Sequence, residues 1–311
     1  MPGKSLKLAT LALCSLPLLG LGGCGVKKTE RLPAEKVLTL RTATLEELVG
    51  RLRQQAEAVT FINAQTELVP STGSAYSGVI EEYHDVRAFV LAERRPEGAA
   101  NRHHIRVIGQ APLVRKNIFD MAADDREFRI FLPTKNKFIV GPTRLARRSE
   151  KPIENLRPQH LLEALFLSAP QRQPLALLFL EENEFAGRRY YAVTEMAQPE
   201  DSPEARYPIW QLSRKWWFDR TDLSLVRAQR FDAEGRLLAD VHYHGWGKTD
   251  GVSYPREIEL VRPQEDYRLK LLVKELKLNQ PLPAERFELE RPAGVELVEL
   301  NDDAAAARKT E

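Results

Sequence analysis

The residue types best suited to chemistry are gathered in one short stretch, Asp240 to His244. Its sequence, DVHYH, places His242 and His244 two residues apart, so on a β-strand both imidazoles share one face with Asp240. Imidazole and carboxylate groups bind Zn²⁺ and similar metals. Val241 and Tyr243, however, have the parity of a buried face, which leaves the histidines on the solvent side. We therefore expect solvated side chains here and no metal site.

Other signatures of catalysis are missing from the sequence. His103 and His104 have no carboxylate close to them in the sequence, and no Gly-x-Ser-x-Gly motif, phosphate loop or dinucleotide fingerprint occurs. The 46 basic and 44 acidic side chains give a net charge of +2, which describes a mixed surface and gives no support to nucleic-acid binding. We expect a non-enzymatic protein without a cofactor.

A reactive residue of another kind, Cys24, ends the amino-terminal apolar run. Lys4 and Lys7 precede an uncharged stretch that is too short for the about 20 apolar residues of a bilayer crossing. A positive start, an apolar middle and small residues at the exit are typical of a secretion signal. The sequence Leu-Gly-Gly-Cys at 21–24 resembles the lipobox of bacterial lipoproteins. That resemblance implies cleavage before Cys24 and acylation of its thiol with fatty acids such as palmitate.

The lipobox interpretation sets the expected organisation of the chain. An ordinary signal peptide with an accidental cysteine is the alternative, and Cys14 is the poorer candidate for lipidation because a leucine precedes it. Gly25 stands where an aspartate favours retention at the inner membrane, so we expect a lipid anchor in the outer membrane, facing the periplasm. We expect a signal peptide at 1–23, a lipidated tether at 24–41, one domain at 42–300 and a flexible tail at 301–311.

The expected domain begins with a helix and continues mainly as strands. Thr44 and Glu47 have the spacing of a capping box, and apolar residues then recur at three- and four-residue steps as far as Val59. Short runs with alternating polarity follow at intervals near ten residues, separated by turn sequences such as DAEG at 232–235. A second helix, apolar nearly all round, is predicted at 158–168.

This pattern predicts a mainly β fold with an antiparallel, strongly curved sheet of about a dozen strands, covered by a few helices. Most strands alternate between apolar and charged residues, so the sheet has an apolar face that must be covered. Two modest helices are too small to cover it completely. Either the sheet closes into a filled barrel, or it forms an incomplete barrel with an apolar hollow under the helices.

The order of helix, strands, buried helix and further strands is similar to that of the LolA/LolB-like family of periplasmic lipoprotein carriers and outer-membrane lipoprotein receptors. The local likenesses are FRIFLPTKNKFIVG at 128–141, FDAEGRLLADVHYHGW at 231–246, YPREIEL at 254–260 and LKLLVKELKLNQPLPAERF at 269–287. The resemblance implies a half-barrel, closed over by helices, whose concave apolar surface receives acyl chains. It also implies lipoproteins, a periplasmic carrier or an envelope complex as partners.

Strand parity selects the residues expected to line the hollow. Burial of acyl chains against such a wall stabilises them by about 25 cal/mol per Å² of apolar surface. Each residue has packed core as the alternative role. The expected lining is Phe89, Leu91, Ile105, Val107, Phe128, Ile130, Leu132, Trp217, Leu225, Val241 and Tyr243, and the expected underside of a helical lid is Leu162, Leu165 and Phe166.

Two functional hypotheses remain open at this point. In the first, an anchored lipoprotein binds acyl chains in lipid or lipoprotein handling at the outer membrane. In the second, the same fold is an envelope interaction or stress-sensing module that binds polypeptide, with the hollow filled by its own side chains. The aromatic run Trp216, Trp217 and Phe218 places aromatic side chains on both faces of one strand, which predicts two-sided packing at a sheet edge or, alternatively, a partner surface or a membrane-facing patch.

Overall fold

A computed structural model describes residues 39–74, 79–82, 86–95, 103–111, 115–143, 157–170, 176–198 and 209–300. The predicted signal peptide, Cys24, the tether up to residue 38 and the predicted tail lie outside the described residues. No helix in the described part is long and apolar enough to span a membrane.

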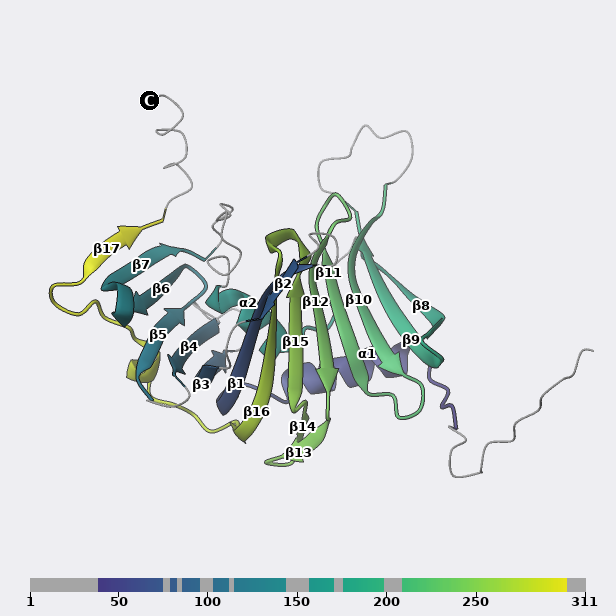
Figure 1. Cartoon of the computed structure of the whole chain (residues 1–311). Helices are drawn as coiled ribbons and strands as arrows, with labels where there is room; N and C mark the ends of the chain where they lie inside the picture. Colours follow the sequence, from purple (N-terminus) through teal and green to yellow (C-terminus); the bar gives the residue numbers. More distant parts are fainter. Residues whose placement is uncertain are drawn as a thin grey trace, which may run out of the picture. The chain divides into compact units, whose positions relative to one another are not determined.

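Two α-helices and seventeen strands make up the described chain (Figure 1). The helices are α1 (Leu45–Glu57) and α2 (Pro158–Leu165). The first seven strands are β1 (Phe61–Ser74), β2 (Val79–Glu82), β3 (Val86–Arg94), β4 (His103–Gln110), β5 (Asn117–Ala123), β6 (Glu127–Leu132) and β7 (Lys137–Pro142). The remaining strands are β8 (Ala176–Phe185), β9 (Arg188–Ala197), β10 (Gln211–Asp219), β11 (Leu225–Phe231), β12 (Leu237–His244), β13 (Gly247–Thr249), β14 (Val252–Tyr254), β15 (Glu257–Arg262), β16 (Tyr267–Leu278) and β17 (Glu296–Glu299).

Fifteen of the described strands form one sheet, and β13 and β14 form a separate hairpin. The order in the sheet is β17-β7-β6-β5-β4-β3-β1-β16-β15-β12-β11-β10-β9-β8, and β2 pairs with β1. The long strands β1 and β16 pair antiparallel and join the early half of the domain to the late half. The path ends at β17 and β8, which do not pair with each other, so this sheet is not closed into a barrel.

The prediction of an entirely antiparallel sheet is wrong at one edge. β17 pairs with β7 in parallel, with Leu297 opposite Phe138. The chain reaches this edge from β16 through a long connection that contains the 3₁₀-helix η5 (Ala284–Phe287), so its direction is not set by a hairpin. The expected strand number of about a dozen is also too low.

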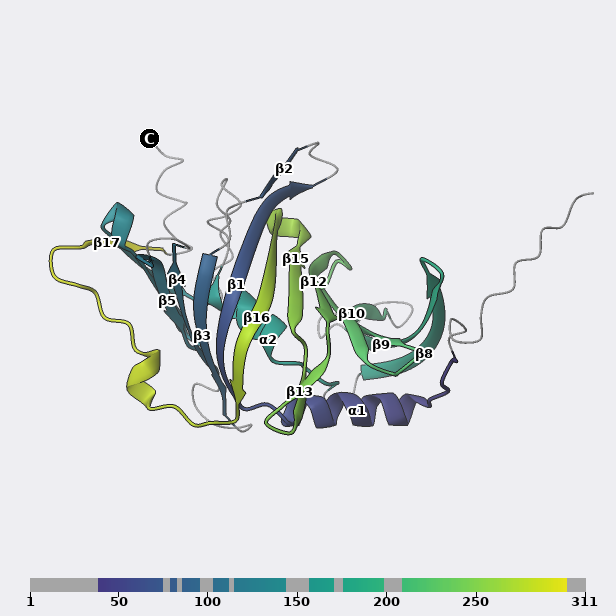
Figure 2. The same cartoon turned by 60° about the horizontal axis from the view of Figure 1, so that its bottom comes forward.

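Both helices lie on the same face of the sheet, which we call the helix face; the opposite face is the outer face. Leu48 and Leu52 of α1 and Leu161 and Leu165 of α2 belong to one apolar core with side chains from strands of both halves of the sheet. Figure 2 shows the strands curving around these helices. The predicted capping box of α1 is present, with Thr44 Oγ1 accepting from the Glu47 amide at 3.3 Å.

Candidate functional site

The helix α2 is the element that covers the predicted hollow. It contacts β4, β5 and β15, and its apolar residues are buried nearly all round. Glu163 is its one exposed residue. The three residues expected under a lid, Leu162, Leu165 and Phe166, are all buried in the core that α2 shares with the sheet.

Side chains from the sheet and from the separate β13–β14 hairpin hold the carboxyl end of α2. The last carbonyls of a helix have no partner within the helix, and in a buried position they need donors from elsewhere. Four donors meet the carbonyls of residues 164–168 at 2.9–3.3 Å: Tyr243 on Ala164, Tyr254 on Leu165, Arg94 on Leu167 and Trp216 on Ser168. Burial raises the pKa of the Tyr243 and Tyr254 hydroxyls, which therefore stay protonated as donors.

The amino-terminal half of α2 is held by a buried polar contact. His160 Nδ1 lies 2.5 Å from the Tyr267 hydroxyl oxygen on β16. Burial lowers the pKa of His160 well below its ordinary value, and the nearby cations Arg262, Arg157 and Arg230 lower it further. Because a neutral imidazole has one unprotonated ring nitrogen, His160 can accept a hydrogen bond from the Tyr267 hydroxyl.

Charged side chains form a row on the helix face beside α2. Arg214 of β10 lies directly opposite Arg230 of β11, and Glu195 of β9 pairs with Arg214 in register. Glu163 reaches down from α2, with Oε1 2.8 Å from Arg230 Nη1 and Oε2 3.7 Å from Arg262 Nη1. We call Arg214, Arg230 and Arg262 the arginine row.

Most residues of the predicted lining lie on the helix face and pack as core. Ile130 is half-buried against this core, and Leu132 is half-buried at the end of β6. The fully packed members are Ile105, Val107, Phe128, Leu225, Val241 and Tyr243, all at most 5% exposed. A role in contacting acyl chains stays a prediction for these residues.

Three residues of the predicted lining are on the outer face instead. Leu91 pairs in register with Arg106, and Phe89 lies under the Arg87 guanidinium at 5.4 Å, whereas Ala88, Val90 and Ala92 belong to the core. Strand β3 is apolar at successive positions, so alternation alone does not decide its facing. Trp217 is likewise on the outer face, because Trp216 and Phe218 enter the core.

Charged, polar and aromatic side chains surround Trp217 on the outer face. Lys215 and Arg227 lie over its ring at 5.0 and 5.6 Å, its Nε1 donates to Gln229 Oε1 at 2.9 Å, and Tyr190 meets it edge-on. The ring is half-buried by these contacts. Cation–π and edge-to-face packing therefore account for an aromatic side chain that no helix covers.

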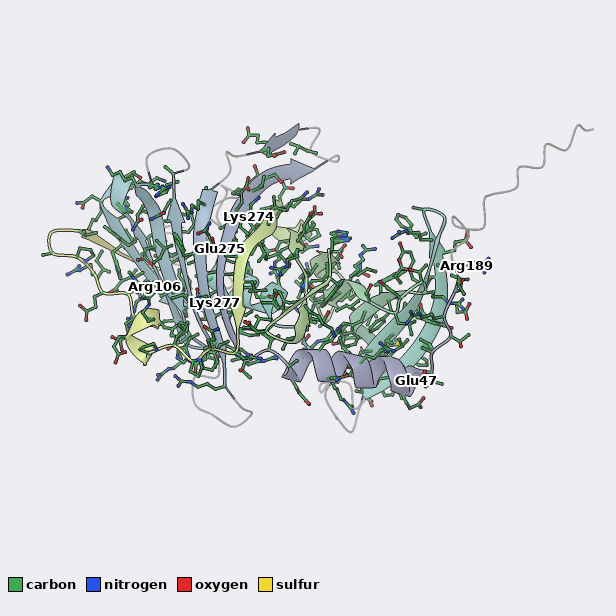
Figure 3. The ribbon with its side chains drawn as sticks, turned by 90° about the horizontal axis from the view of Figure 1, so that it is seen from below. Glu47, Arg106, Arg189, Lys274, Glu275 and Lys277 are labelled. Atoms are coloured by element: carbon green, nitrogen blue, oxygen red, sulfur yellow. The ribbon has the colours of Figure 1, made fainter. Side chains whose placement is uncertain are left out.

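A carboxy-terminal segment, residues 284–295, covers the outer face of β4–β7 before the chain enters β17 at the sheet edge, and was missed by reasoning from the sequence. Leu289 packs with Ala122 and Phe138 in a second apolar cluster. Arg106 makes a bidentate pair with Asp120 at 3.1 and 2.8 Å and donates to the carbonyls of residues 286 and 288. Figure 3 shows Arg106 beside the yellow segment that contains η5. The missed signal is the presence of apolar residues on both faces of β5 and β7.

The cluster of Asp240, His242 and His244 lies on the outer face, as expected. Asp240 accepts two hydrogen bonds from Arg227, at 2.7 and 2.6 Å, and His242 Nε2 lies 3.3 Å from it. Burial by itself would raise the pKa of Asp240, but the hydrogen bonds from Arg227 and His242 lower it. The His242 and His244 rings stack at 6.4 Å. No group of three potential metal ligands is found among the described residues.

His103 and His104 have carboxylate partners that are distant in the sequence or on the neighbouring strand. His103 Nδ1 lies 2.9 Å from Asp125 Oδ1, and His104 Nδ1 lies 3.4 Å from Glu93 Oε2. Burial lowers the pKa of His104, followed by the effect of Arg95. His104 lies on the outer face, with its ring 5.8 Å from the ring of Phe287, whereas His103 has the parity of the core residues Ile105 and Val107.

Comparison with solved structures shows what this geometry resembles. No family model and no curated protein matches the sequence. A DUF1329 family protein from Desulfovibrio piger is 14% identical, with a TM-score of 0.51, over 78% of this chain and 94% of that chain. A putative outer membrane lipoprotein-sorting protein domain from Vibrio parahaemolyticus is 12% identical, with a TM-score of 0.50, over 78% and 94%. A LolA superfamily protein from Nitrosomonas europaea is 14% identical, with a TM-score of 0.46, over 80% and 99%.

Sequence identities this low do not indicate function. The structural similarity shows the fold alone. The chain has a LolA-like fold: one large curved sheet with helices on one face. The expected resemblance is confirmed at that level.

Proposed function

We propose that this protein is a non-enzymatic, membrane-anchored lipoprotein that binds acyl chains on the helix face, in lipid or lipoprotein handling at the outer membrane. The LolA-like fold and the envelope-related name of one structural neighbour support this role. The proposed anchor is the acylated Cys24, and the proposed partners are lipids, acylated proteins or a periplasmic carrier.

The proposal rests mainly on how α2 packs against the sheet and how its carboxyl end is hydrogen-bonded. Its apolar residues share one core with Ile105, Val107 and Phe128, and its carboxyl end is held by side-chain hydrogen bonds. An acyl chain that takes the place of α2 side chains keeps the same wall out of water, at about 25 cal/mol per Å². The helix can therefore exchange with a ligand without leaving the apolar face exposed.

Loosening α2 tests this mechanism. We expect the double change Tyr243→Phe and Tyr254→Phe, in the full chain carrying Cys24→Ala, to raise the affinity for a fluorescent C11 fatty acid by about fivefold for each hydrogen bond removed, because each contributes about 1 kcal/mol net. Tyr190→Phe, on the outer face, is the matched control and leaves the affinity unchanged. Absence of binding in the parent chain and in the double variant, with no lipid in the purified protein by mass spectrometry, would overturn the acyl-binding proposal.

The close packing of side chains on the helix face favours a second function. Six predicted lining residues are already packed as core, which supports the alternative of an envelope interaction or stress-sensing module that binds polypeptide. In that case α2 is permanent core, and the tyrosine variants lose stability without gaining affinity for the fatty acid. The same titration therefore separates the two functions.

The anchor needs its own experiment. We expect radiolabelled palmitate to enter the parent chain in bacterial cells and to be lost in Cys24→Ala, whereas Cys14→Ala retains the label. Fractionation of the labelled cells should place the protein in the outer membrane. Equal labelling of the parent chain and Cys24→Ala would exclude Cys24 as the lipidated residue.

A further inference from the structure

The arginine row has a charge arrangement that the apolar function does not need. Arg214 and Arg230 are directly opposite each other on neighbouring antiparallel strands, where Cβ atoms are about 4.5–5.5 Å apart. Like charges in such cross-strand pairs destabilise a sheet. A bound anion placed between them would remove this repulsion.

Arg214 is the least compensated member of the row. Its ion-pair partner in the described part of the chain is Glu195, and the distance of 3.8 Å is too long for a hydrogen bond. Burial raises the pKa of Glu195, and Arg214 opposes this shift. The guanidinium group has five N–H donors, so Arg214 retains donors for a ligand.

The other two arginines each have a buried nitrogen donor without a hydrogen-bond partner in the described part of the chain. Arg262 Nη1 and Arg230 Nε are buried and have no hydrogen-bond partner among the described residues. The Arg262 side chain is only 5% exposed. A buried donor without a partner costs stability, so such atoms in a native protein call for an explanation, and a ligand is one.

Two members of the arginine row are accessible and border apolar surface. The side chains of Arg214 and Arg230 are 32% and 38% exposed, so an anion can reach them. Along the same cross-strand line, Glu195 pairs with Leu178 and Arg230 pairs with Ala239, both of which lie at or in the apolar core. A ligand with an anionic end and an apolar chain fits this boundary between charged and apolar residues.

We propose that Arg214 and Arg230 bind the anionic group, a carboxylate or phosphate, of an acyl ligand whose chain lies on the helix face. This inference rests on the proposed acyl-binding function and adds the chemical class of the ligand. Glu163 competes with the ligand, because it occupies Arg230 and approaches Arg262 from α2. Binding of the anion thus exchanges one negative partner of Arg230 for another and releases a contact of α2.

Three probes of equal chain length test the proposal on the full chain carrying Cys24→Ala: dodecyl phosphate, lauric acid and 1-dodecanol, titrated by calorimetry. We expect both anions to bind at least about tenfold more tightly than the alcohol, because hydrogen bonds to charged groups are the stronger class. Arg214→Gln and Arg230→Gln should reduce this preference to less than about twofold. Glu163→Gln should increase anion affinity, since it removes the negative partner of Arg230, while Arg262 keeps its pair with Glu265.

The matched control is Arg268→Gln, an exposed arginine paired with Glu259 on the outer face, which should leave the preference unchanged. Arg214→Gln removes a like charge, so we expect it to fold at least as stably as the parent chain; it decides the test if Arg230→Gln does not fold. Inorganic phosphate is titrated as a competitor, and its failure to displace dodecyl phosphate assigns the site to a lipid headgroup.

The outcomes separate this inference from the proposed function. Equal binding of the alcohol and the anions by the parent chain overturns the anion site and leaves acyl binding standing. Persistence of the anion preference in both arginine variants also overturns it. If inorganic phosphate binds at the row and none of the three acyl probes binds, the acyl-ligand class is wrong and the proposed function fails with it.

Discussion

The two halves of the sheet differ in what covers their outer faces. In the half formed by β3–β7, the core covers the helix face and residues 284–295 cover the outer face, where Phe138 and Leu289 are buried together. In the half formed by β8–β12, the outer face remains accessible, and Phe179 on β8 is 45% exposed. Burial of an outward-pointing side chain is thus decided by a segment that comes from far along the chain.

Each half of the sheet has a similar arginine–aspartate pair on its outer face, so the two halves can be compared directly. Arg106–Asp120 joins β4 to β5, and Arg227–Asp240 joins β11 to β12, both as bidentate pairs on the outer face. Arg106 also donates to two carbonyls of the carboxy-terminal segment, whereas Arg227 lies over Trp217. The same chemistry therefore anchors a covering segment in one half and supports a half-buried aromatic side chain in the other.

The largest expected difference between covered and uncovered positions comes from two phenylalanines. Phe128→Ala should lower the free energy of unfolding by about 3–5 kcal/mol, because it leaves a cavity in the core beneath α2. Phe179→Ala, at the exposed edge strand, should cost less than about 1 kcal/mol. Urea denaturation measures both, and losses of similar size would contradict the assignment of these two sites.

The arginine pairs provide the next test. Arg106→Gln should lower stability by about 2 kcal/mol, because it leaves the Asp120 carboxylate buried without its cation. It should also accelerate amide hydrogen exchange across residues 284–300. Arg227→Gln is the matched control, since it breaks a similar pair but should leave exchange in that segment unchanged. Unchanged exchange in Arg106→Gln would show that this arginine does not hold the segment.

The buried His160 predicts a pH dependence of stability. Because its pKa is lowered in the folded state, the unfolded chain binds a proton more readily, and stability is lost as pH falls below about 6.5, the unfolded-state value. The loss from this group approaches about 1.4 kcal/mol per pH unit until the folded-state pKa is reached. His160→Gln should flatten the stability profile between pH 6.5 and 4.5. An unaltered slope in this variant would exclude His160 as the cause.

The smallest expected effect concerns the edge strand β8. Phe179→Lys should change stability by less than about 0.5 kcal/mol, because the side chain is already in water at this position. It should, however, reduce concentration-dependent self-association in size-exclusion chromatography, since exposed apolar edge strands promote pairing between molecules. Leu289→Lys, in the covered cluster, should be strongly destabilising by comparison. A large loss of stability in Phe179→Lys would indicate that an element covers this edge.

Local sequence patterns were sufficient for the elements themselves. Thr44 and Glu47 form the predicted capping box, and the predicted second helix begins at Pro158, although it ends at Leu165 instead of residue 168. The DAEG turn forms as well, with Asp232 Oδ1 accepting from the amides of residues 234 and 236. These features depend on contacts within a few residues, which the sequence displays directly.

Face assignments were correct only where one side of a strand is polar. The parity of β12 placed Val241 and Tyr243 in the core and His242 outside, because the alternation there is clean. It failed for Phe89 and Leu91, whose strand is apolar on both sides. A period of two specifies that neighbouring residues point to opposite faces, but it does not specify which face is covered.

The amino-acid sequence by itself determined the helices, most strands, the turns and the LolA-like order of elements, since these follow from short-range propensity and polarity. Only the tertiary structure decided the parallel β17, the covering of β4–β7 by residues 284–295, and the meeting of Arg214, Arg230, Arg262 and Glu163. The physical reason is that these contacts join residues tens to hundreds of positions apart, and packing of the whole sheet around α2 selects them.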